Sequence, residues 1–230
     1  MVLIQYYNLL IAYNLSTPTE FEVIGEDSNA SLDSNEAISA LNADDLLTYN
    51  AKLAAVVKLV CTYKSLSRLP HGTSFTSLTS IDVNKCVHVT SLPASWNVNN
   101  TVNSINASYT QIASIPTELS SSLTQLRVEG CRNITSVNAA GIKRLIVSHS
   151  TIRELVSPTS LVSLFATNSR LAVVSSQTLR VMSWSSALGE SLNVSPVCTS
   201  LLEIISDAES AIVVPSDLSD CSVARFQYLS

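Results

Sequence analysis

The stretch of sequence that decides the fold is SLTSIDVNKCVHVTSLP, residues 77–93. Its apolar residues follow the spacing L-x-x-L-x-L-x-x-C-x-x-L-x-x-L from Leu78 to Leu92, with any aliphatic residue allowed at L. The same spacing returns in SLTQLRVEGCRNITSV, residues 122–137. Because successive side chains of a strand point to opposite faces, the residues of the L-x-L core share one face. The spacing therefore predicts a short strand with one buried face, followed by a turn and used repeatedly.

Comparable units follow one another from residue 56 onward. Clear units begin at Val56, Leu78, Val102, Leu123, Ile142 and Leu161. A weaker unit contains Leu179, Met182, Trp184 and Ala187. Two degenerate units follow, one near Leu202 and Ile205 and the other near Leu218, Cys221, Val223 and Phe226. The starts through Leu179 are separated by 22, 24, 21, 19, 19 and 18 residues, close to the roughly 20–29 residues of a leucine-rich repeat. We therefore predict a leucine-rich repeat solenoid of about eight or nine units over residues 56–230.

Each unit is expected to contribute one strand to a parallel sheet on the concave side, with inward aliphatic residues stacked between neighbouring units. The units after residue 120 are too short for a full helix on the convex side, so we expect turns, 3₁₀ segments or short strands there. The ninth residue of each unit, counted from its first aliphatic residue, lies where the chain leaves the strand. A small polar side chain there can form hydrogen bonds with backbone groups that the sheet leaves unpaired. That position is small at Cys86, Thr110, Cys131, Ser150 and Ser169, with Lys64 as the exception.

Residues 1–55 do not follow the repeat. Met1 to Leu15 can form one or two strands, residues 21–24 read as a short strand, and residues 35–60 carry a broken helical stripe. A solenoid must close its first coil, because an open end exposes both the core and a strand edge. We therefore expect a mixed α/β capping segment over residues 1–55, with a small separate domain as the alternative.

The composition argues against several classes of function. Charged residues make up 13% of the chain, the net charge is −5, and Lys and Arg are not clustered as nucleic acid or an anionic membrane would require. With 5 glycines there is no phosphate-binding loop, and His71, His88 and His149 lack metal-ligand spacing. No run of 18 apolar residues is present, so membrane insertion is not expected. We predict a protein that is not an enzyme and uses no cofactor or metal.

Five cysteines and six glycosylation sequons bear on the compartment. Cys86 and Cys131 are explained by the repeat, whereas Cys198 and Cys221 either form a disulfide in an oxidising compartment or remain two free thiols. The sequons lie at Asn14, Asn29, Asn99, Asn106, Asn133 and Asn193, hardly more than chance gives in a chain this rich in Ser and Thr. A glycan on Asn106 would obstruct the concave face.

Two phrases resemble the repeats of leucine-rich surface antigens of kinetoplastid parasites, namely SLTSIDV at residues 77–83 and SLPASW at residues 91–96. The stretches IPTEL (115–119) and LTQLRV (123–128) are similar to bacterial effector leucine-rich repeats as well. The resemblance covers about residues 56–190 and implies that a protein partner binds, mostly on the concave sheet. Met1 to Leu15 lack the basic start and cleavage site of a signal peptide, so we favour an intracellular location over the cell surface or secretion.

The outward strand positions define the candidate partner-binding face. Between the two inner aliphatic residues of consecutive units lie Arg127, Ile146 and Phe165, and aromatic residues and Arg dominate the energetics of interfaces. A second outward column is expected at Asn84, Ser108, Glu129, Ser148, Thr167 and Ser185. The candidate partner-binding residues are Tyr109, Arg127, Glu129, Ile146, His149 and Phe165. The alternative is that Ile146 and Phe165 only pack on each other.

The sequence thus predicts a non-catalytic interaction module, either a parasite surface antigen or an intracellular scaffold. The alternative is the substrate-recognition part of a larger enzyme system, of the ubiquitin ligase or receptor type. A Cys- or Ser-dependent catalytic segment outside the repeats would support that alternative, and residues 1–55 contain no such motif. A free-standing hydrolase is the least favoured reading, because no G-x-S-x-G motif is present.

Overall fold

The computed structural model describes residues 2–6, 9–13, 20–26, 57–60, 75–97, 99–120, 122–207, 212–216, 218 and 222–226. The chain forms two compact bodies. The N-terminal body contains residues 1–111 and 116–122, and the C-terminal body contains residues 112–115 and 123–230.

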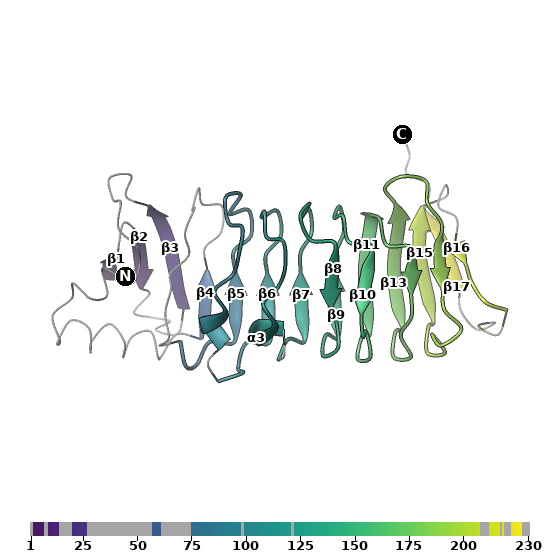
Figure 1. Ribbon diagram of the computed structural model, residues 1–230, viewed down its shortest axis with the longest axis horizontal. Helices are drawn as coiled ribbons and strands as arrows, with labels where there is room; N and C mark the ends of the chain where they lie inside the picture. The colour runs from purple at the N-terminus through teal and green to yellow at the C-terminus, as the bar shows by residue number, and fades with distance from the viewer. Residues whose placement is uncertain are drawn as a thin grey trace. The chain divides into compact units, whose positions relative to one another are not determined.

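The described part of the N-terminal body is built around one sheet (Figure 1). It begins with two antiparallel pairings, of β1 (Val2–Tyr6) with β2 (Leu9–Tyr13) and of β2 with β3 (Glu20–Glu26). Parallel pairing then continues from β3 through three further strands, which are β4 (Lys58–Val60), β5 (Ser80–Asp82) and β6 (Ser104–Asn106). The strands expected within residues 1–15 and 21–24 are therefore present. The expected helical stripe at 35–60 lies outside the described residues except at its end, which is strand β4.

The C-terminal body contains a main parallel sheet and two smaller parallel sheets. The main sheet consists of β7 (Gln125–Arg127), β9 (Arg144–Ile146), β11 (Ser163–Ser169), β13 (Val181–Ser186), β15 (Glu203–Asp207) and β17 (Ser222–Phe226). The return segments between these strands pair β8 (Ser136–Asn138) with β10 (Glu154–Val156). They also form a row of β12 (Val173–Val174), β14 (Leu192–Val194) and β16 (Ile212–Val213).

The chain is therefore a parallel β-solenoid of stacked coils, with about seven turns and little helix. The described helical segments are the 3₁₀ helix η1 (Ala94–Asn97) and the single-turn helix α3 (Thr117–Ser120), both in the N-terminal body. Neither is long enough to cross a membrane, and no other described segment is helical. After residue 120 the return segments are turns and short strands, as their length predicted.

The core follows the predicted spacing closely. From Leu78 to Leu92 the six repeat positions are each at most 3% exposed, and from Leu123 to Val137 they are each at most 4% exposed. The pairing of Leu126 with Leu145 stacks equivalent residues of neighbouring coils. Burial of each such aliphatic side chain contributes roughly 1.5–3 kcal/mol, so the stacked column is the main source of stability.

The turn after each strand has a repeated backbone geometry. The residue just before the small ninth position has a positive φ: Lys85 (60°), Tyr109 (57°), Gly130 (68°), His149 (56°) and Asn168 (50°). The small residue then closes the turn, as expected. Thr110 Oγ1 donates to the carbonyl of Ala107 at 2.8 Å, and Ser150 Oγ donates to that of Val147 at 2.5 Å. A small polar residue therefore suits this position, because its hydroxyl group can donate to a backbone carbonyl of the same coil.

The register departs from the prediction in the last coils. Ala187 is exposed, and Leu202 is 55% exposed, whereas Leu201 and Ile204 are buried. The segment LLEII, residues 201–205, fits the spacing in two registers one residue apart, and such a slip exchanges the two faces of a strand. The observed register buries the neutral Ser206 in the next inward slot, and the expected one would have buried the charged Asp207, which is costly. The expected register placed Val223 at the third apolar position of L-x-x-L-x-L. In the structure Val223 pairs with Ile204, which occupies the second apolar position of its own unit.

Asn97 ties η1 to α3 within the N-terminal body. Its side chain is 5% exposed. Its Nδ2 donates to the carbonyl of Glu118 and, at 3.1 Å, to Ser122 Oγ. Its Oδ1 accepts from the backbone N–H of Val102 at 3.0 Å.

Replacing this side chain should destabilise the N-terminal body. We expect Asn97→Ala to lower the free energy of unfolding by about 1–3 kcal/mol, because buried partners lose their hydrogen bonds. Urea denaturation followed by circular dichroism measures the change. The exposed Asn99, whose Nδ2 donates to the carbonyl of Thr76 at 3.0 Å, provides the matched control Asn99→Ala. An equal loss in both variants would contradict the role given to Asn97.

Candidate functional site

The main sheet of the C-terminal body places the predicted outward residues Arg127, Ile146 and Phe165 in one row. The row continues through Ser183 to Ile205, which the expected register had placed inward. Strand pairing aligns Arg127 with Ile146, Ile146 with Phe165, Phe165 with Ser183, and Ser183 with Ile205. The side chain of Arg127 is 48% exposed, and those of Ile146, Phe165 and Ile205 are partly exposed. We call these five residues the outward row. Three of them are candidate residues, and the structure brings them together as predicted.

Phe165 has a partner that the sequence did not indicate. The guanidinium carbon of Arg144 lies 5.0 Å from the centroid of the Phe165 ring. Arg144 belongs to β9 and pairs with Ser163, so it reaches Phe165 diagonally on the adjacent strand β11. A cation over an aromatic ring at an exposed site contributes about 0.5–1 kcal/mol. Phe165 therefore does more than pack on Ile146, and Arg144 belongs to the candidate site.

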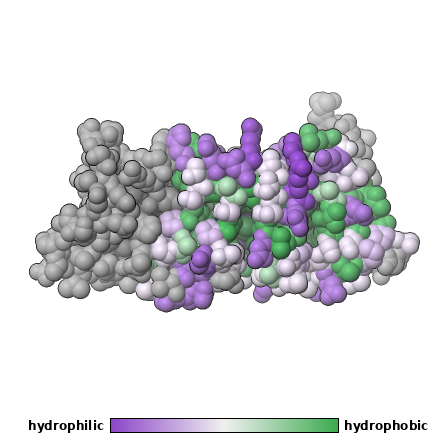
Figure 2. Space-filling model, in the orientation of Figure 1, coloured by the Kyte–Doolittle hydropathy of each residue, from purple (hydrophilic) through white to green (hydrophobic). Residues whose placement is uncertain are grey.

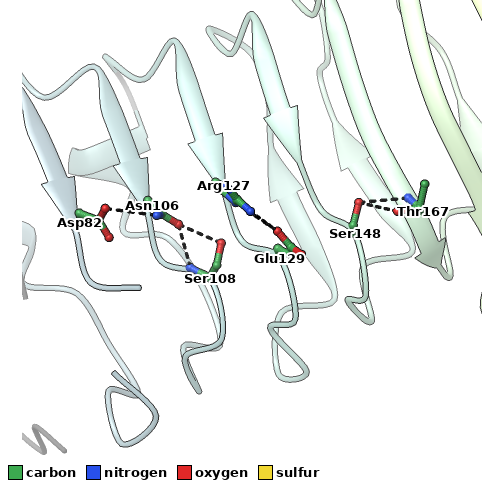
Figure 3. A network of polar contacts seen from close by, with 7 residues as sticks. All are labelled: Asp82, Asn106, Ser108, Arg127, Glu129, Ser148 and Thr167. Atoms are coloured by element: carbon green, nitrogen blue, oxygen red, sulfur yellow. Dashed lines mark hydrogen bonds and ion pairs between the residues drawn. The ribbon is translucent and has the colours of Figure 1, made fainter. Parts of the chain in front are cut away.

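Arg127 and Glu129 form an ion pair within one coil (Figure 3). Arg127 Nε donates to Glu129 Oε2 at 3.2 Å, and Nη2 donates to the same oxygen. Glu129 is only 16% exposed, while Arg127 is 48% exposed. The pair holds the Arg127 guanidinium against the sheet at one end of the outward row, and it neutralises much of its charge.

Two serines expected on the outward face are buried. Ser148 is 7% exposed, and its Oγ lies 3.0 Å from Thr167 Oγ1 and accepts from the Thr167 N–H (Figure 3). Ser108 is 0% exposed, and its Oγ donates to Asn106 Oδ1 at 2.9 Å. The expectation of exposure was wrong because the chain turns at the next residue, which has a positive φ. The Ser148 hydroxyl therefore links neighbouring coils, and the Ser108 hydroxyl bonds within its own coil, instead of facing a partner.

Asn106 is also engaged in this arrangement. Its Nδ2 donates to Asp82 Oδ2 at 3.3 Å (Figure 3). A glycan attached to Nδ2 would replace one of its two N–H groups and crowd the neighbouring strand. The sequon at Asn106 is therefore a poor acceptor in the folded protein, in line with the expected obstruction of the face.

The last two candidate residues lie in turns. Asn168 Nδ2 and His149 Nδ1 are 2.9 Å apart and join neighbouring coils of the C-terminal body. Tyr109 is 39% exposed in the N-terminal body, with Lys85 Nζ 5.9 Å from its ring centroid. His149 is thus a turn residue beside the outward row, and Tyr109 belongs to a separate body from the other five candidates.

The described cysteines are not placed to act as nucleophiles, because they are buried. Cys86, Cys131 and Cys198 are buried and none forms a disulfide in the described part of the chain, while Cys61 and Cys221 lie outside it. Burial raises the pKa of the Cys198 thiol above its ordinary value, although hydrogen bonds with the backbone of Ser176 and Ser195 lower it in part. A thiol in that state stays protonated at neutral pH. Cys198 is consequently a core residue.

The class that the fold and the described residues define is a β-solenoid whose main sheet carries the outward row, with Ile146, Phe165 and Ile205 partly exposed. Among the described residues, no group of three or more His, Cys, Asp or Glu side chains is placed to hold a metal ion. No family model matches the sequence, and no curated protein is significantly similar to it.

Proposed function

We propose that this protein is a non-catalytic interaction module that binds a protein partner on the main-sheet face of its C-terminal body. The observation that carries the proposal is the outward row, which aligns Ile146, Phe165 and Ile205 on parallel strands with partly exposed side chains. Apolar area removed from water stabilises a complex by about 25 cal/mol per Å² before the costs of association. An apolar row on an ordered sheet is therefore a suitable centre for an interface.

The surroundings of the row support the same use. Arg144 lies over Phe165, and the side chains of Ser163 and Ser183, both partly exposed, flank the ring on neighbouring strand positions. Interfaces combine an apolar centre, enriched in aromatic residues and Arg, with a polar rim. Because strands hold the backbone of these residues, little backbone entropy is lost on binding.

Within this proposal we assign the solenoid to the leucine-rich repeat type and residues 1–55 to a capping segment. The support for the repeat type is the burial of the L-x-x-L-x-L positions and the small residue at the turn. The support for a cap is the change from parallel to antiparallel pairing at β3. A surface antigen like those of kinetoplastid parasites and an intracellular scaffold are the two settings in which such a module would act.

Removing two side chains of the outward row should weaken partner binding and preserve the fold. We expect Phe165→Ala combined with Arg127→Ala to reduce partner capture by about tenfold or more, because centrally placed aromatic and Arg residues carry most of the binding energy. Proximity labelling in the native organism, with quantitative mass spectrometry of the labelled proteins, measures the loss. Circular dichroism checks that the variant is folded.

The matched control removes the same residue classes elsewhere. Val173 is 54% exposed and Arg132 is exposed, and both belong to return segments of the same body. Val173→Ala combined with Arg132→Ala should leave the labelled set unchanged. If the outward-row variant labels the same proteins as the control, the main-sheet face is not the binding surface.

A further inference from the structure

The C-terminal body has a surface depression of about 600 Å³ on its return segments. It is lined by Arg153, Arg170, Ala172, Gly189, Glu190 and Ser191, which belong to three successive coils. None of these residues is part of the outward row. Figure 2 shows that hydrophilic and hydrophobic side chains gather in separate patches on the visible face of this body.

Two arginines reach the depression from fixed backbone positions. The N–H of Arg153 donates to the carbonyl of Thr135 at 2.9 Å, and Arg153 follows the buried Ile152. Arg170 lies between the buried residues Ser169 and Leu171. Because their neighbours are anchored in the core, both Cα atoms are held in place while both residues line the depression.

The third wall is a loop of defined shape. The hydroxyl of Ser186 accepts from the backbone N–H of Leu188 at 3.1 Å and from that of Glu190 at 2.7 Å. Gly189 between them has a φ of 72°. A Cβ at this glycine would have no atom within 4 Å, so the depression is open on that side. A small ligand can therefore reach the two arginines from solvent.

The charged side chains of the depression have no bonding partner within the described part of the chain. There, the side chains of Arg153, Arg170 and Glu190 form no hydrogen bond or ion pair. Two cationic groups thus share one depression with a single carboxylate, in a protein whose net charge is −5. The guanidinium group is a planar fork of donors that matches the oxygens of phosphate and related anions.

We propose that this depression binds a small ligand through a phosphate or sulfate group, held by the guanidinium groups of Arg153 and Arg170. The hydroxyl of Ser191 is a further donor at the same wall, and Glu190 accepts from hydroxyl groups of the ligand. The Glu190 carboxylate also disfavours a ligand with a second anionic group close by, because like charges repel. This site is independent of the partner-binding face and can be tested alone.

The test is a titration of the whole protein with inorganic phosphate and with sulfate at constant ionic strength. The amide resonances of residues 189–191 are followed by NMR. We expect saturable shifts at these residues, and about tenfold weaker binding in Arg153→Gln and in Arg170→Gln, because each removes a charge-assisted contact. Glu190→Gln should tighten binding by about two- to fivefold, since it removes a repulsive charge.

Control variants separate a site from general charge. Arg132→Gln and Arg180→Gln change the net charge equally at exposed positions outside the depression, so they should bind phosphate like the wild type. Shifts that never saturate, or equal weakening by all four Arg variants, would overturn the proposal. Acetate is the comparison for carboxylates, and tighter binding of acetate than of phosphate and sulfate would overturn the ligand class. Unchanged resonances elsewhere verify that each variant is folded.

Discussion

Val128→Asp is expected to unfold the C-terminal body. Val128 is 0% exposed, so its side chain lies in the stacked core, and its N–H donates to the carbonyl of Ile146 in the next coil at 2.9 Å. An aspartate there would be a buried charge, and the described neighbours Leu126 and Leu145 offer it no cationic partner. We expect a cost above about 4 kcal/mol, a large part of the roughly 5–15 kcal/mol that stabilises most domains. Circular dichroism and a thermal melt measure the loss.

Strand β7, which ends one residue before Val128, offers a matched control. Gln125 is exposed on the opposite side of β7, so Gln125→Asp adds the same charge in water. It should change stability by no more than about 0.5 kcal/mol. In a solenoid each coil is stabilised by its neighbours, so the damage from Val128→Asp should spread to adjacent coils. A melting curve of Val128→Asp equal to that of Gln125→Asp would show that the inward register is wrong.

Trp184→Ala is expected to have the next largest effect. Trp184 is 0% exposed, and its Nε1 donates to the carbonyl of Leu171 at 3.0 Å. Removing the indole leaves a cavity and an unsatisfied carbonyl group. We expect a loss of about 3–5 kcal/mol, typical for the truncation of a buried aromatic side chain. Urea denaturation with circular dichroism detection measures it, since fluorescence would change with the tryptophan itself.

Two further variants separate packing from hydrogen bonding. Trp184→Phe keeps most of the apolar volume and loses the Nε1 donor, so we expect a smaller loss of about 1–3 kcal/mol. Ser183→Ala, at the neighbouring outward position, should be close to the wild type. A wild-type denaturation midpoint for Trp184→Ala would contradict the placement of the indole in the core.

Much of the fold follows from sequence because the repeat is local. The spacing within residues 77–93 and 122–137 assigns inward and outward positions correctly, since a strand alternates its faces every residue. The length of the return segments correctly predicts strands and turns there after residue 120. Local spacing fails where aliphatic residues are adjacent, as at Leu201 and Leu202, because both registers fit it equally well.

The candidate site was only partly predictable. The shared row of Arg127, Ile146 and Phe165 follows from the repeat length alone. The stacking of Arg144 on Phe165 does not, because it depends on how a long side chain crosses to the adjacent strand. The burial of Ser148 was also missed, because it depends on the backbone bend at the following residue.

By itself, the sequence determined that the chain coils, which residues face its core in most coils, and that Arg127, Ile146 and Phe165 share one outward row. These properties depend on the period of apolar residues, and burial of apolar area is sufficient to enforce that period. The tertiary structure alone decided which polar groups are partners. Ser148 and Thr167 are 19 residues apart in sequence, and they meet because neighbouring coils stack in register. The same stacking brings Arg153 and Arg170 into one depression, since hydrogen bonds and charges act through space, across coils that the local pattern does not connect.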